Sequence, residues 1–119
     1  MAYVDGFVLA LPKRKVKTYL QIARKAGRIW KDHGALEYRE ALGDDLKVKW
    51  GMAFPKAIRA RTGETVVFSW IVYKSRAHRD SVNKKVMKDK RLASMMDPKT
   101  MPFDMKRMAY GGFKIAVDA

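Results

Sequence analysis

Apolar and polar residues follow one another along the chain in patterns that predict four strands. Residues 3–11 and 65–73 are almost continuously apolar and rich in β-branched or aromatic side chains, which is typical of buried strands. Residues 35–42 alternate well enough for a second strand, and residues 107–117 are predicted to form the fourth. Within this last strand, Gly111–Gly112 indicates a bulge or a close approach by a neighbouring segment.

Two segments carry a helical pattern instead. Between residues 13 and 31, apolar side chains recur at the i, i+3, i+4 and i+7 positions of one helical face. His33–Gly34 is predicted to end this helix, because glycine readily takes the left-handed conformation that often follows a helix. Ser75 is expected to cap a second helix over roughly 76–91. Asp89 is expected to interrupt that helix and cap a shorter piece.

The remaining segments are predicted to be ordered connections within one domain, residues 1–119. Residues 46–63 form a long arm between the second and third strands. A structureless connection of that length is uncommon in a compact domain unless it contacts something. Residues 97–106 contain two prolines and form a loop before the last strand.

The element order is therefore β-α-β-β-α-β, which predicts an α+β, ferredoxin-like fold. Two β-α-β units in one sheet give an antiparallel four-stranded sheet with both helices on the same face.

The other sheet face also needs to be covered, because the central strands are apolar on both sides. Within residues 66–72, Ser69 is the one polar residue. A second copy of the chain is the simplest cover, since two-fold dimers are the commonest oligomers, and it would produce a dimeric α/β barrel. The alternative is that the 46–63 arm of the same chain covers this face.

Composition narrows the chemistry. The chain has no cysteine and two histidines, so thiol chemistry is excluded, and neither a metal site nor a cofactor is expected. No stretch approaches the roughly 18 apolar residues of a membrane span, so we expect a soluble, cytoplasmic protein without a membrane partner.

The net charge of +14, from 26 basic and 12 acidic residues, raises a second kind of function. The two predicted helices hold 15 of the basic residues. This charge favours weak, salt-sensitive binding of RNA or DNA through the helical faces. The alternative is a solvated surface, because no nucleic-acid-binding motif accompanies the charge. The third predicted strand partly mimics an RNA-recognition motif, but Val66–Val67 stands where that motif has a basic residue and a glycine.

Several segments together resemble the YbaA-like family along almost the whole chain. They are Tyr3-Val4-Asp5-Gly6-Phe7, His33-Gly34-Ala35-Leu36-Glu37-Tyr38, Gly63-Glu64-Thr65-Val66-Val67-Phe68-Ser69-Trp70, Arg76-Ala77-His78-Arg79-Asp80, Asp97-Pro98-Lys99, Met101-Pro102-Phe103-Asp104, Lys106-Arg107-Met108 and Tyr110-Gly111-Gly112-Phe113. That family is uncharacterised and of the dimeric α+β barrel type. The resemblance implies two ferredoxin-like protomers packed sheet on sheet, and it implies no established activity, cofactor or catalytic residue.

The candidate function is a homodimer with a small-molecule pocket between helices and sheet in each protomer, enzymatic or not. If it is an enzyme, cofactor-free acid/base or oxygenase-like chemistry with His33 as base is the hypothesis. The alternative for His33 is a partly exposed residue that interacts with the helix dipole. The expected ligand-binding residues are Tyr38, Trp70, Arg107 and Tyr110.

Two further features carry open alternatives. The methionine-rich segment 97–110 fits either a pocket wall or a lid over the core. Tyr38 and Trp70 fit either the pocket or the dimer seam. His78 is expected to be a solvated surface histidine.

Overall fold

The two most apolar segments form the two longest strands in this computed structural model, which describes residues 1–119. They are β1 (Tyr3–Pro12) and β3 (Glu64–Tyr73), and they pair with each other at the centre of the sheet. β2 (Glu37–Leu42) pairs with β3, and β4 (Ala109–Lys114) pairs with β1. The strand order is β2-β3-β1-β4, and every neighbouring pair is antiparallel.

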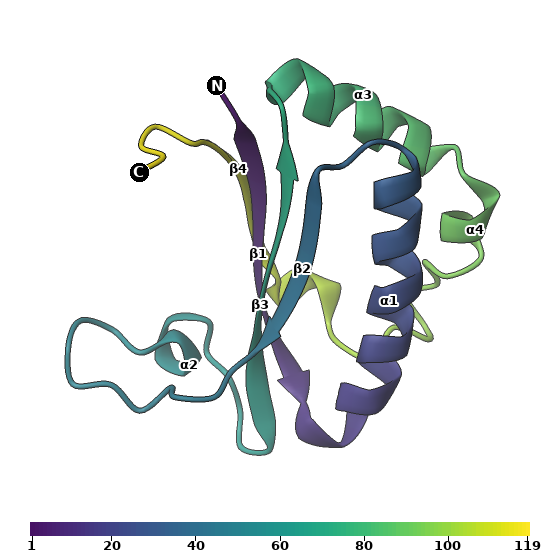
Figure 1. Cartoon of the computed structure of the whole chain (residues 1–119). Helices are drawn as coiled ribbons and strands as arrows, with labels where there is room; N and C mark the ends of the chain where they lie inside the picture. The colour runs from purple at the N-terminus through teal and green to yellow at the C-terminus, as the bar shows by residue number, and fades with distance from the viewer.

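The two long helices, α1 (Val16–Asp32) and α3 (Arg76–Met87), lie on the same face of this sheet (Figure 1). The 3₁₀ turn η1 (Lys13–Lys15) leads from β1 into α1, and the short helix α4 (Lys90–Ala93) follows α3. This order of helices and strands confirms the predicted α+β fold with an antiparallel four-stranded sheet, and its arrangement is ferredoxin-like.

Two strand boundaries differ from the prediction for local reasons. β2 begins at Glu37 rather than residue 35, because the Ala35 amide still donates to the Trp30 carbonyl at the end of the helix. β4 covers Ala109–Lys114 rather than 107–117, since the 3₁₀ turn η2 (Met105–Arg107) occupies the start of the expected strand.

The glycine pair in β4 makes a close approach and no bulge, since its register with β1 is continuous. A Cβ atom on Gly112 would lie 2.5 Å from the Tyr3 hydroxyl. The missing side chain therefore lets the buried Tyr3 ring lie across β4.

The helix ends follow the predicted caps. His33 is the C-cap residue of α1, and Gly34 follows it with a φ of 109°, a conformation that favours glycine. The Ser75 hydroxyl accepts a hydrogen bond from the His78 amide at 3.0 Å, and the Asp89 carboxylate accepts one from the Arg91 amide at 2.9 Å. These contacts satisfy backbone donors that α3 and α4 would otherwise leave unpaired.

His78 is not the freely solvated residue that the sequence suggested. Its ring is half-buried, and its Nδ1 atom accepts a hydrogen bond from the Lys74 amide at 2.9 Å. The ring also packs edge-to-face with Tyr73, with the two ring centroids 5.9 Å apart. The Ser75 cap at the start of α3 causes this placement, because it turns the first helical residues back over the end of β3.

The core lies between the helices and the sheet in two clusters. The larger one surrounds Tyr73 and Ile29 and reaches α3 and α4, whereas the smaller one surrounds Leu9 and Leu11 beside the first half of α1. Polar and partly buried residues separate the two clusters, and a cavity lies between them.

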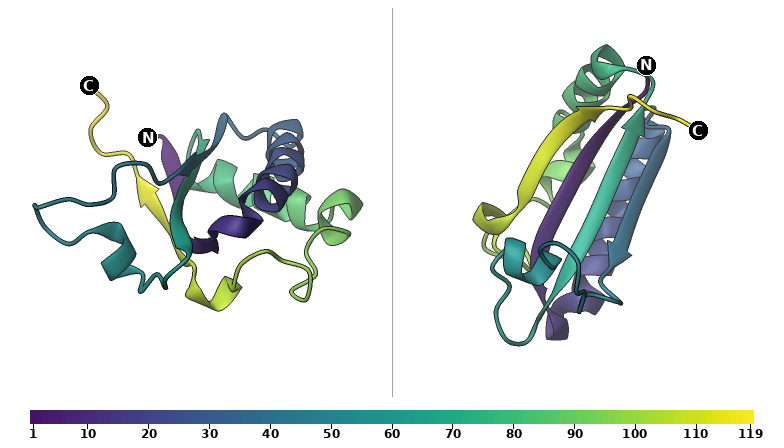
Figure 2. Two further views of the ribbon diagram at one scale, coloured as in Figure 1. Left: turned by 90° about the horizontal axis from the view of Figure 1, so that it is seen from below. Right: turned by 90° about the vertical axis from the view of Figure 1, so that its left-hand side faces the viewer.

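The sheet face turned away from the helices, called the outer face below, is largely apolar. By the strand register it carries Val4, Gly6, Val8, Ala10, Glu37, Arg39, Ala41, Val66, Phe68, Trp70, Val72, Ala109, Gly111 and Phe113. The 46–63 arm, with the short helix α2 (Phe54–Ala57), covers one end of this face, where Phe54 packs on Phe68 (Figure 2). Phe68 and Phe113 remain 44% and 59% exposed, so the arm covers the outer face in part.

The outward sides of the helices are basic, as the charge count suggested. Most of their lysines and arginines are exposed, whereas Arg79 and Arg91 form ion pairs with acidic side chains. None of the helices combines the length and the apolar character needed to cross a membrane.

Candidate functional site

A cavity of about 330 Å³ lies between the two core clusters, bordered by the sheet, α1, α3 and the segment after α4, and it is partly open to solvent. Hydrophobic side chains make up 18 of its 23 lining residues. Six of the eight methionines of the chain line it: Met87, Met95, Met96, Met101, Met105 and Met108. The methionine-rich segment is thus both a cavity wall and a cover for the core, since Phe103 and Met108 also pack against the smaller cluster.

Antiparallel pairing determines which residues form the sheet side of the cavity. Residues directly opposite one another point to the same face. One row across the sheet consists of Glu40, Ser69, Phe7 and Tyr110, and the next consists of Tyr38, Ile71, Asp5 and Gly112. Three polar residues, Asp5, Glu40 and Ser69, therefore stand in an otherwise apolar surface.

Asp5 is 1% exposed and belongs to a hydrogen-bonded network at the α3 side of the cavity. Its carboxylate forms an ion pair with the Arg79 guanidinium at 2.8 Å. Burial raises the pKa of Asp5, while Arg79 and the Asn83 amide oppose that rise. Trp30 Nε1 and the Tyr73 hydroxyl both donate to the Asn83 side-chain oxygen at 3.2 Å, which fixes the amide beside Asp5.

Glu40 lies at the other side of the cavity. The Tyr19 hydroxyl donates to one of its oxygens at 2.7 Å, and the Tyr38 hydroxyl donates to the other at 2.8 Å. Burial, reinforced by the nearby Glu40 charge, raises the pKa of both tyrosines well above the usual range. Both phenols therefore stay protonated and act as donors at neutral pH.

Of the five site residues predicted from the sequence, two line the cavity and three lie elsewhere in the structure. Tyr38 and Tyr110 line the cavity, on β2 and β4. Trp70 lies on the outer face, where its Nε1 atom donates to Glu37 at 3.1 Å. His33 and Arg107 are absent from the lining and take part in ion pairs elsewhere.

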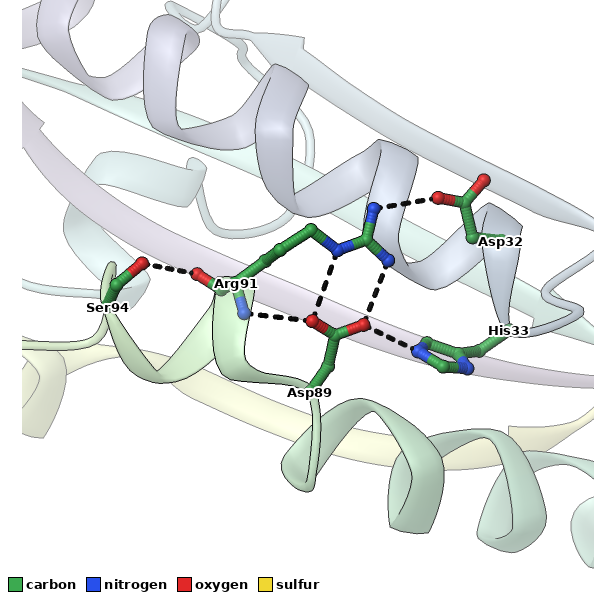
Figure 3. Close-up of polar contacts among 5 residues, drawn as sticks. All are labelled: Asp32, His33, Asp89, Arg91 and Ser94. Carbon is green, nitrogen blue, oxygen red and sulfur yellow. Dashed lines mark hydrogen bonds and ion pairs between the residues drawn. The ribbon is translucent and has the colours of Figure 1, made fainter.

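His33 connects α1 to α4. Its Nε2 atom lies 2.8 Å from an Asp89 oxygen, and Arg91 binds both Asp89 and Asp32 (Figure 3). The Arg91 hydrogen bonds, followed by that of His33, hold the pKa of Asp89 well below its usual range. The imidazole therefore tethers two helix ends, and the structure does not bring it to the cavity.

Arg107 connects η2 to the start of β3 and to the arm. Its guanidinium makes two hydrogen bonds of 2.8 Å to the Glu64 carboxylate and one of 3.0 Å to the Arg59 carbonyl. Arg59 has a φ of 54°, which is uncommon for a residue with a side chain, so this contact holds an unfavourable turn in place. The hydrogen bonds from Arg107 lower the pKa of Glu64 to about 2.

The Glu64–Arg107 pair predicts a specific acid sensitivity. A carboxyl whose pKa is lowered on folding stabilises the protein above its unfolded pKa of 4.5, and this contribution is lost as the pH falls toward about 2. We expect Glu64→Gln to lower the free energy of unfolding by about 1–2 kcal/mol at pH 7 and by progressively less below about pH 4.5. Urea unfolding across this pH range measures the difference.

The matched control is Asp45→Asn, which removes an exposed carboxylate that makes no ion pair. It should leave the stability nearly unchanged at every pH. A Glu64→Gln deficit that stays constant down to pH 2 would contradict the prediction.

Sequence reasoning missed Asp5, Glu40, Arg79 and Asn83 as cavity or network residues. One signal was available: Asp5 is a lone charge inside an apolar strand, a position that normally requires a buried partner. Ser69 was recognisable as the polar residue of its strand. The sequence did not show which face of the sheet it lies on, because that depends on the register of β3 with its neighbours.

No group of three or more histidine, aspartate or glutamate side chains lies close enough to hold a metal ion. The two carboxylates of the cavity have different partners: Asp5 forms an ion pair with Arg79, and Glu40 accepts hydrogen bonds from two tyrosines.

Comparisons with known proteins show the family of this chain. A family model described as a protein of unknown function, DUF1428, matches residues 2–105. The chain is 43% identical over 118 residues to the uncharacterized protein YbaA of Escherichia coli strain K12, with 99% of each chain covered, and equally similar to YbaA of Shigella flexneri.

A crystal structure of an uncharacterized NIPSNAP domain protein from Burkholderia xenovorans is similar in fold. The TM-score is 0.62 at 16% sequence identity, over 98% of this chain and 97% of that one. At this identity the likeness concerns the fold alone. The sequence comparisons, in contrast, confirm the resemblance seen in the sequence segments: the chain belongs to the DUF1428 family, whose function is unknown.

Proposed function

We propose that the protein binds a small, largely apolar molecule in the cavity between its helices and its sheet. The observation that carries this proposal is a cavity, partly open to solvent, with mostly hydrophobic walls and a few polar groups. Its volume of about 330 Å³ lies within the range of roughly 300–1,000 Å³ that is common for small-molecule sites.

The methionine walls support the same proposal. Methionine has an unbranched, flexible side chain, so it adapts its shape to different apolar partners. Met87, Met96 and Met105 are also 62%, 40% and 37% exposed, so they lie where a ligand would enter from solvent.

Fluorescence titration with the apolar dye N-phenylnaphthylamine tests this function. The dye should bind the wild type, and Ala26→Phe should weaken binding by at least about tenfold because the new ring fills the cavity. Gln21→Phe is the matched control, since it places the same ring on the exposed side of α1 and should leave binding unchanged. Absence of dye binding, or equal binding by the two variants, would overturn the proposal.

We also infer that the functional form is a homodimer joined through the outer face. The exposed rings of Phe68 and Phe113, beside half-buried Val4, Trp70 and Val72, support this inference. Contiguous apolar patches of this kind commonly mark interaction sites, and a two-fold arrangement covers both copies with the same surface.

The 46–63 arm adds a second support for the dimer. It extends away from the protomer on the outer-face side (Figure 1), and its Trp50 and Met52 side chains are 91% and 65% exposed. In a sheet-on-sheet dimer this arm would pack beside the partner subunit, which would bury these side chains.

The basic helical faces give less support to nucleic-acid binding. Proteins that bind single strands combine positive charge with aromatic side chains on which bases stack. Here Phe68 and Phe113 lie on the outer face, whereas the basic helices lie on the opposite side of the sheet. Tyr110 is the exposed aromatic ring on the helix side, and a single ring gives no row of stacking platforms.

A further inference from the structure

Glu40 is the acidic side chain of the cavity that lacks a basic partner. It stands in the middle of β2 and lines the cavity, and none of the ion pairs in the structure includes it. Two tyrosine hydroxyls bind its oxygens, but each phenol supplies a single proton and no charge. Each carboxylate oxygen thus keeps a lone pair for a further donor.

The other charged groups around the cavity are already paired. Asp5 is neutralised by Arg79, and Arg39 binds Glu37 through a guanidinium that is 64% exposed. Arg24, Arg28 and Lys31 line an open hollow on the far side of Glu40, and none of them lies within 4.0 Å of its carboxylate. Water in that open hollow screens their charge. The inside of the cavity therefore carries one uncompensated negative charge.

Ser69 adds a second polar group beside Glu40. The two residues are directly paired across β2 and β3, so their side chains point into the same space about 5 Å apart at Cβ. Ser69 is buried, and its hydroxyl makes no hydrogen bond within the protein. Since no fully enclosed side-chain oxygen lacks a partner, the Ser69 hydroxyl opens onto the cavity.

We propose that the cavity selects apolar molecules that carry a hydrogen-bond donor, above all a protonated amine, which Glu40 and Ser69 bind together, and that it rejects carboxylates. This inference rests on the proposed ligand-binding function. The ammonium or hydroxyl group of the ligand donates a hydrogen bond to Glu40. An ammonium group also donates a second hydrogen bond to the Ser69 oxygen, whereas a ligand hydroxyl oxygen accepts one from the Ser69 hydroxyl. The apolar body of the ligand then lies against the methionine and aromatic walls.

The proposed preference for amines is opposite to the preference that the net charge of the whole protein would produce. A net charge of +14 attracts anions to the molecule as a whole, so a nonspecific interaction would favour a carboxylate over an amine. Within the cavity the nearest unpaired charge is negative, and its interaction with a ligand charge is stronger than in bulk water because most of the lining residues are hydrophobic. A preference for the amine is therefore a signature of Glu40 and cannot arise from the overall charge.

Competition against bound N-phenylnaphthylamine with four ligands of equal chain length tests this inference. Octylamine should displace the dye at a concentration at least about tenfold lower than octanoate does. Octanol should compete better than methyl octyl ether, which accepts hydrogen bonds but donates none. Equal or tighter binding of octanoate would overturn the inference while the dye itself still reports a working cavity.

Two variants assign the preference to Glu40. For each protein, the displacement constants of octanoate and octylamine are corrected for the dye affinity, and their ratio is taken. In Glu40→Gln this ratio should be at least about tenfold lower than in the wild type. Glu37→Gln is the control, because Glu37 lies on the same strand but on the outer face, and the ratio should stay as in the wild type. An unchanged ratio in Glu40→Gln overturns the inference. If Glu40→Gln does not fold, the wild-type ligand series still decides. Failure of the wild type to bind the dye would instead overturn the proposed function itself.

Discussion

Arg79→Met is expected to lower the free energy of unfolding by about 3–5 kcal/mol at pH 7, because it leaves Asp5 buried without its ionic partner. The side chains of the pair are 14% and 2% exposed, so little water is available to replace the guanidinium. Methionine keeps most of the aliphatic length of arginine, which limits the loss of packing. Urea unfolding monitored by circular dichroism measures this change.

The deficit should depend on pH in a defined direction. Burial already raises the pKa of Asp5, and the loss of Arg79 raises it further. A carboxyl with a raised pKa favours the folded state when it is protonated and disfavours it once the pH rises through the folded pKa. The Arg79→Met deficit should therefore be largest at neutral pH and shrink as the pH falls toward about 4.

Two further variants control for other causes. Arg76→Met removes an exposed arginine from the first turn of the same helix and should change stability by less than about 0.5 kcal/mol. Asp5→Asn combined with Arg79→Met removes both charges and should recover part of the loss, because no buried charge is left unpaired. A pH-independent deficit in Arg79→Met, or no recovery in the double variant, would contradict the account of the pair.

Phe68→Asp is expected to dissociate the proposed homodimer. A two-fold interface contains each residue twice, so a loss of about 2 kcal/mol per copy raises Kd by roughly a thousandfold. Phe68 stands on the central strand β3, and each new carboxylate would be buried against the partner's apolar face. Sedimentation velocity over a concentration series should show a dimer for the wild type and a monomer for the variant.

The matched control is Leu36→Asp. Leu36 is 46% exposed, close to the 44% of Phe68, but it lies before β2 and outside the outer face. This variant should remain dimeric. Unfolding curves of both variants must show that they are folded. A wild type that sediments as a monomer at all accessible concentrations would remove the dimer from the proposed function.

Local patterns in the sequence were enough to predict the elements of the fold. The helical spacing in α1, the Ser75 cap and the unbroken apolar run of β3 are properties of neighbouring residues, and the structure confirms each. The exact start of β2 was missed, because it depends on a hydrogen bond between Ala35 and Trp30 at the helix exit.

The candidate site was harder to predict, since it depends on contacts between distant segments. Trp70 alternates onto the outer face, and only the register with β1 and β2 assigns that face. Arg79 stands among many basic residues in the sequence, and nothing local distinguishes it from Arg76. Its partner Asp5 lies 74 residues earlier in the chain, so the pair emerges only when β1 packs against α3.

The central position of β1 has a consequence for synthesis. Tyr3 is translated well before its strand partners Tyr73 and Lys114, which come much later in the chain. At about 5–20 residues per second, the apolar β1 segment remains unpaired for on the order of ten seconds on the ribosome. Pairings between such distant segments also fold slowly. We expect this nascent strand to be a target for ribosome-associated chaperones, because it is one of the two most apolar strands and the one that waits longest for its partners.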